Sequence, residues 1–221
     1  MDERYRRGYW NCSYRVSPVE RPPSLPEFIQ IIREVEGHET GWPVWLLLDN
    51  QRERKPYLKD GVIECWLKDT ALGDFWRADP HGRMSLTRLL QEDVEAPADI
   101  GQGKIFGLTL PVWRTGECLL HAGRLADRLS ADTVELMMTW VGLQGRVLSA
   151  IGSPNRWVTP GRICRENEVR TSITVEALAI SDTLPDLVRR LVSSLYAHFD
   201  FFVPPEEIYT TETERMRHRV R

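Results

Sequence analysis

Residues 169–177 carry the pattern that most narrows the fold of this chain. Apolar or β-branched side chains at Val169, Thr171, Ile173 and Val175 alternate with the polar side chains between them. A period of two places the two sets on opposite faces of a β-strand, so this segment is expected to be a strand with one buried face and one wet face. Antiparallel sheets commonly leave one face in water, whereas parallel sheets are covered on both faces. The pattern therefore predicts a mostly antiparallel sheet.

The segments around this strand complete a mixed α+β order. An amphipathic helix is expected from Pro111 to about Leu129, and a second helix opens at a capping box at 183–186 and ends near 202. Strands are expected at 105–110, 134–140, 147–151 and 169–177, with a hairpin turn at 142–145. The C-terminal half thus reads strand-helix-strand-strand-strand-helix, which predicts the α+β class, with amphipathic helices packed on one face of the sheet.

The N-terminal half is also expected to combine helices and strands, and it is rich in aromatic residues. The capping box at Ser24–Glu27 predicts a helix that runs to about Glu36. Strands are expected at 8–16, 43–48 and 61–67, and weaker elements at 75–77 and 84–90. A segment rich in Pro, Gly and acidic residues, 95–103, predicts a seam. We therefore expect an aromatic-rich α+β subdomain at 1–95, a second α+β subdomain at 104–203 and a polar tail at 204–221, with one single domain as the alternative.

Composition excludes several classes of protein. The chain has 29 Lys and Arg residues against 32 Asp and Glu residues, so it lacks the strongly basic charge of many nucleic-acid-binding chains. Its four cysteines and five histidines are dispersed without the close pairs that a zinc site needs. We expect no metal and no cofactor, and we expect the cysteines to be buried as small apolar side chains. The sequence shows no secretory signal and no membrane span, which predicts a cytoplasmic protein without membrane contact.

Two groups of side chains are candidates for a ligand- or partner-binding site. On the expected helix 111–129, Glu117 and His121 are neighbours at a spacing of four, and Trp113, Arg114, Arg124 and Arg128 lie near them. The alternative for this stripe is an ordinary solvated helix face. In the loop after the first helix, Glu39 and Trp42 could form one wall of a pocket. The alternative for the loop is a simple connection whose tryptophan fills the core.

Several phrases of the chain resemble a known family. They are Gly8–Arg15, Glu39–Pro43, Gly61–Leu67, Asp74–Ala78, Leu110–Arg114, Gly116–His121, Gly142–Arg146 and Tyr196–Phe202. Together they resemble the C-terminal region of bacterial Schlafen-like proteins, described as ATP-binding or DNA-binding, whose N-terminal part is an AlbA-type domain. The AlbA-type domain has no counterpart here, so no ATP- or DNA-binding role is carried onto these residues. The resemblance implies a partner or sensor portion, either standing alone or belonging to a longer protein, in bacterial regulation or phage defence.

Three functions remain open from the sequence. The first is a non-enzymatic module that binds a ligand or protein partner, or a second copy of itself, through Glu39, Trp42, Trp113, Arg114, Glu117 and His121. The second is a nucleic-acid accessory protein in which Arg114, Arg124 and Arg128 contact phosphates, because the helix–three strands–helix order is similar to double-stranded-RNA-binding domains. The third is a hydrolase that uses Glu117 and His121 as an acid–base pair.

Overall fold

A seven-stranded antiparallel sheet is the centre of the computed structural model, which describes residues 3–48, 54–95, 98–150 and 156–218. Along the sheet the strands follow the order β2-β3-β4-β5-β1-β7-β9, and every neighbouring pair is antiparallel. Their bounds are β1 Tyr9–Ser17, β2 Tyr57–Lys59, β3 Val62–Trp66, β4 Phe75–Asp79, β5 Arg83–Leu89, β7 Thr133–Val141 and β9 Glu168–Glu176. The α+β class and the mostly antiparallel sheet are thereby confirmed.

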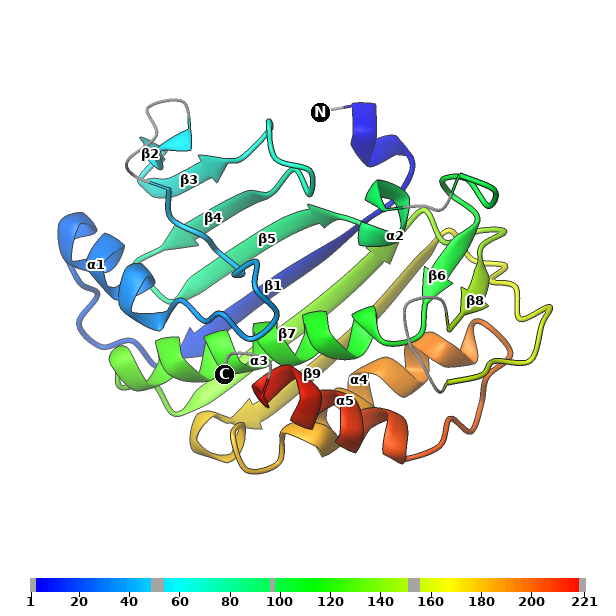
Figure 1. Ribbon diagram of the computed structural model, residues 1–221. Helices are drawn as coiled ribbons and strands as arrows, with labels where there is room; N and C mark the ends of the chain where they lie inside the picture. Colours follow the sequence, from blue (N-terminus) through cyan, green and yellow to red (C-terminus); the bar gives the residue numbers. More distant parts are fainter. Residues whose placement is uncertain (1–2, 49–53, 96–97, 151–155, 219–221) are drawn as a thin grey trace.

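Helices cover one face of this sheet (Figure 1). The long helix α3 packs on β1 and β7, α4 packs on β9, and α5 contacts both of these helices. The bounds are α1 Leu25–Val35, α2 Gln91–Val94, α3 Leu110–Arg128, α4 Leu184–Ala197 and α5 Glu207–His218, with short 3-10 turns η1 Glu3–Arg6 and η3 Ala177–Ala179. The capping box of α1 is present, since the Ser24 backbone N–H donates to Glu27 Oε2 at 2.8 Å.

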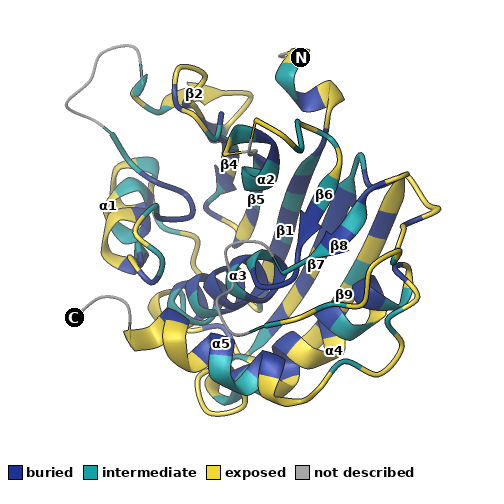
Figure 2. Cartoon of the chain, turned by 45° about the vertical axis from the view of Figure 1, so that its right-hand side comes forward, coloured by how far each residue is buried: buried dark blue, intermediate teal, exposed yellow. Residues whose placement is uncertain are grey.

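None of the described helices lies on the other face of the sheet, and burial alternates along β1, β4 and most of β9 accordingly (Figure 2). In β1, Trp10, Cys12, Tyr14 and Val16 are buried beneath the helices, while the residues between them are exposed or half-buried on the other face. We call that second surface the open face. All four cysteines are free and buried, as expected from the sequence.

The sheet runs across the seam expected at 95–103. β1 pairs with β5 on one side and with β7 on the other, so strands from both halves of the chain share one sheet and one core. This topology favours the single-domain alternative. The segment expected as a polar tail, 204–221, instead contains α5, whose Ile208, Tyr209 and Met216 are buried against α3 and α4.

Two strand predictions need correction. Residues 43–48 form no strand: Trp45 has a φ of 51°, residues 43–46 are buried and residues 47–48 are half-buried. This irregular segment lies against β4 and β5, since Trp45 Nε1 donates to the Ser85 carbonyl and Trp76 Nε1 donates to the Leu46 carbonyl. Burial alone therefore explains its hydrophobicity. The second correction concerns β8 (Val147–Ser149), which pairs in parallel with β6 (Ile105–Gly107) rather than forming a hairpin with β7. The predicted chain order is right, but helix, three strands and helix do not build a double-stranded-RNA-binding topology.

Candidate functional site

The stripe of polar residues on α3 lies inside the molecule. Arg114 is 5% exposed, Glu117 is 1% exposed and His121 is fully buried. The solvated-face alternative is therefore wrong for these three residues. They are covered because α3 lies between the sheet and the loop 37–46, a position that periodicity along one helix does not reveal.

Glu117 is the centre of a closed hydrogen-bond network. Its Oε1 accepts from the Thr40 hydroxyl, and its Oε2 accepts from Arg114 Nη1 at 2.7 Å. Arg114 Nη1 also donates to Thr40 Oγ1 at 2.8 Å, and Nη2 donates to Gln91 Oε1 at 2.6 Å. The network joins α3 to the loop and to α2, so these groups hold the fold together.

His121 belongs to a separate set of contacts. Its Nδ1 lies 2.7 Å from the Tyr14 hydroxyl, and its ring stacks on Trp45 with centroids 4.4 Å apart. Burial, with a smaller contribution from the charge of Arg124, lowers the pKa of His121 to about 3, so the imidazole is neutral. Among the described residues, no hydrogen bond joins His121 to Glu117. The expected acid–base pair is thus not assembled in this geometry.

The loop 37–46 and α3 are in contact, so the two groups of candidate residues predicted from the sequence lie next to each other. Arg124 Nη1 lies 2.6 Å from Glu39 Oε1, and the Arg124 Nε donates to the backbone carbonyl of Val35 at 3.0 Å. Trp42, however, turns to the sheet side and donates from Nε1 to Asp74 Oδ2 at 3.1 Å. Trp113 donates from Nε1 to Glu212 on α5 at 3.2 Å.

The three arginines proposed for phosphate contact all have carboxylate partners in the chain. Arg114 pairs with Glu117 and Arg124 with Glu39, while Arg128 lies 2.6 Å from Glu34. Arg114 is also inaccessible to a nucleic acid because it is buried. A phosphate would have to displace a carboxylate at each of the other two positions.

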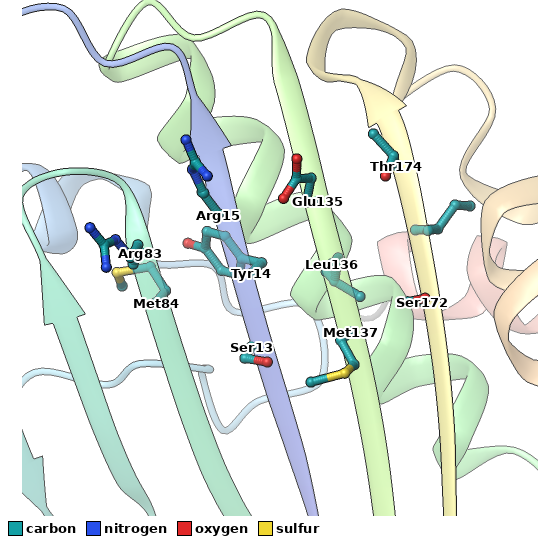
Figure 3. A pocket seen from close by; sticks show the side chains of 11 residues that line it. Ser13, Tyr14, Arg15, Arg83, Met84, Glu135, Leu136, Met137, Ser172 and Thr174 are labelled. Atoms are coloured by element: carbon teal, nitrogen blue, oxygen red, sulfur yellow. The ribbon is translucent and has the colours of Figure 1, made fainter.

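An open groove lies on the opposite face of the sheet, over β1, β5, β7 and β9 (Figure 3). Its volume is about 470 Å³. The side chains directed to this face include Ser13, Arg15, Arg83, Glu135 and Met137, and β9 contributes Ser172 and Thr174. The polar part of this lining comes from exposed or half-buried residues.

Charges of both signs lie in one row that crosses the groove and continues to Asp79 beyond its lining. Arg15 of β1 stands directly opposite Arg83 of β5 and, on its other side, opposite Glu135 of β7. Arg83 is itself opposite Asp79 of β4, with 3.7 Å between Nε and the Asp79 carboxylate. Followed from β4 through β5 and β1 to β7, the row is therefore an acidic residue, two arginines and a second acidic residue. Two like charges directly opposite each other are unfavourable, so an incoming carboxylate between the two arginines would relieve repulsion.

Sequence reasoning missed this groove. The alternation of β1 indicates that Ser13 and Arg15 share a face. Their approach to Arg83 and Glu135 depends on which strands flank β1, and those neighbours come from distant parts of the chain. The candidate residues from the sequence and the groove thus lie on opposite sides of the sheet.

Within the described part of the chain, no group of three or more His, Cys, Asp or Glu side chains is arranged to hold a metal ion. None of the described helices is both long and apolar enough to cross a membrane. No protein-family model, no curated protein and no solved structure matches this chain.

Proposed function

We propose that this chain is a non-enzymatic binding module that holds a protein partner on the open face of its sheet. The observation that carries the proposal is the groove with its row of two central arginines flanked by two acids. A bacterial regulatory or phage-defence system, the setting that the family resemblance implies, would use such a module to recognise another protein.

The mixed charge of the groove favours a protein over a nucleic acid. A phosphate backbone carries one sign of charge and would meet the carboxylates of Glu135 and Asp79 beside the arginines. A protein surface can place an acidic side chain between Arg15 and Arg83 and a basic one beside Glu135. Met137 is 37% exposed in the same groove and offers an apolar contact to the same partner.

The proposal assigns a different role to the residues singled out from the sequence. Glu39, Arg114, Glu117 and His121 are engaged in contacts beneath the sheet, where they brace α3 and the loop 37–46. Changes at these positions are expected to act on stability first. Partner binding is instead expected to depend on side chains of the open face.

The test compares groove variants with a charge-matched control. Arg15→Glu reverses the central charge, and Ser13→Arg fills the floor of the groove. Arg190→Glu makes the same charge change at an exposed position of α4, on the helical side. Each tagged variant is produced in the native host, and co-purifying proteins are quantified by mass spectrometry.

We expect one protein to be recovered equally with the unchanged chain and with Arg190→Glu, and to be depleted with both groove variants. Retention of that protein by Arg15→Glu and Ser13→Arg would contradict the proposal, as would the absence of any protein that distinguishes these variants. Circular dichroism of each variant establishes that the fold is retained, so that loss of the partner reports on the surface.

A further inference from the structure

The outermost strand, β9, has one edge that the sheet does not use. β9 ends the strand order and pairs with β7. Two backbone bonds at the ends of this ladder define its phase: Gly142 N–H donates to the Asn167 carbonyl and Ala177 N–H to the Asp132 carbonyl, both at 2.8 Å. In an antiparallel pair the backbone groups alternate in direction. The odd-numbered residues of β9 therefore bond to β7, and the even-numbered residues direct N–H and C=O away from the sheet.

This edge has the features of a strand that accepts another strand. β9 is nine residues long and contains neither proline nor glycine, and its β-branched residues favour extended structure. Among the described residues, no other segment forms a backbone hydrogen bond to its even-numbered positions. Natural proteins usually shorten, bend or cover such an edge, because unpaired N–H and C=O groups recruit further strands.

The charges on β9 are complementary to a second copy of β9 in one register. An antiparallel pairing about a two-fold axis at Ile173 places Arg170 opposite Glu176 of the other copy, and this occurs twice by symmetry. Moving the axis to Ser172 would instead place Glu168 opposite Glu176, two like charges. With the axis at Ile173, Ser172 faces Thr174, and the outward backbone groups of these even-numbered residues meet as hydrogen-bonded pairs.

We infer that two copies of this chain associate through the free edges of β9 and form one continuous antiparallel sheet with Arg170–Glu176 pairs across the junction. The Arg170 side chain is 64% exposed, and its bond to Glu168 within the strand leaves further guanidinium donors for the second copy. Glu176 is exposed at the other end of the strand. This inference rests on the backbone edge of β9 and does not require a partner in the groove, although Ser172 and Thr174 belong to both surfaces.

The first experiment follows the oligomeric state through charge exchange. Sedimentation and native mass spectrometry are measured from low to high micromolar protein for the unchanged chain, Glu176→Arg, and the double variant Arg170→Glu/Glu176→Arg. Glu214→Arg, at an exposed position on α5, is the control for the added charge. We expect a dimer for the unchanged chain and the control, dimerisation at least about tenfold weaker for Glu176→Arg, and recovery in the double variant.

The second experiment tests the backbone edge itself. Ser172→Pro removes an outward N–H while leaving the ladder to β7 intact, because residue 172 does not donate to β7. We expect Ser172→Pro to be a monomer with native circular dichroism and Ser172→Ala to remain a dimer. A monomer at every concentration of the unchanged chain would overturn the inference. A dimer that neither Glu176→Arg nor Ser172→Pro weakens would overturn it too, because association would then use another surface.

Discussion

The ion pair between Arg88 and Asp74 is expected to be one of the most sensitive points of the fold. Both side chains are completely buried, and two parallel bonds of 2.8 and 2.7 Å join the guanidinium to the carboxylate. Arg88 also donates to the backbone carbonyl of Pro43 at 2.7 Å, and Asp74 accepts from Trp42. The pair thus ties the irregular segment after α1 to β5.

Removing either partner leaves the other charge buried without its counter-ion. Asp74→Ala leaves the Arg88 guanidinium without its counter-ion, and such changes cost about 3–5 kcal/mol. Arg88→Met leaves the Asp74 carboxylate without its counter-ion, with the Trp42 indole as its remaining side-chain donor, and removes the Arg88 donor from the Pro43 carbonyl, so a similar loss is expected. Since small domains are stable by about 5–15 kcal/mol, either change removes a large share of the folding free energy.

The double variant separates the charge effect from simple loss of packing. With both charges gone, no uncompensated ion remains, so Asp74→Ala/Arg88→Met should cost less than the sum of the single changes by at least about 2 kcal/mol. Free energies of unfolding come from urea titrations followed by tryptophan fluorescence, with equal slopes required for comparison. Asp186→Ala, in the exposed pair with Arg189, is the control and should cost below about 1 kcal/mol.

Two results would refute this reasoning. One is a cost below about 1 kcal/mol for Asp74→Ala, which would mean that the guanidinium finds another counter-ion or water. The other is additivity of the two single changes within about 0.5 kcal/mol, which would mean that the residues do not interact energetically.

Three further predictions concern stability and reactivity. Burial lowers the pKa of His121 from 6.5 to about 3, so between pH 7 and pH 5 the imidazole becomes protonated in the unfolded chain but stays neutral in the folded chain. The free energy of unfolding should therefore fall by about 2 kcal/mol between pH 7 and pH 5. Urea titrations at the two pH values should show this fall for the unchanged chain and not for His121→Phe. An unchanged fall in His121→Phe would contradict it. Gly142→Ala should lower the melting temperature more than Gly145→Ala, because both have positive φ but only at Gly142 would a Cβ lie 2.5 Å from a backbone carbonyl oxygen; equal shifts would count against this. Burial raises the pKa of the Cys12 thiol well above its usual range, so a thiol reagent should label Cys12 only at the rate of unfolding, and immediate labelling of the native protein would disprove it.

Local periodicity predicted most elements of this fold correctly. The capping box and apolar spacing of residues 24–36 correspond to α1, and the alternation at 169–177 corresponds to β9. These signals work because a helix or strand must direct one set of side chains to the core at its own period. The strand prediction for residues 43–48 was wrong because a continuously apolar segment has no period that distinguishes a strand from an irregular chain.

The candidate site depended on tertiary structure much more strongly. The sequence indicates that Arg114, Glu117 and His121 share one side of a helix, and that Arg15 and Ser13 share one side of a strand. It contains no local signal that the first side is covered by a loop while the second stays open. That outcome depends on β1 lying between β5 and β7, and on all the long helices packing on one face. The period of a segment determines which residues lie together, but the neighbours supplied by distant parts of the chain decide whether water reaches them.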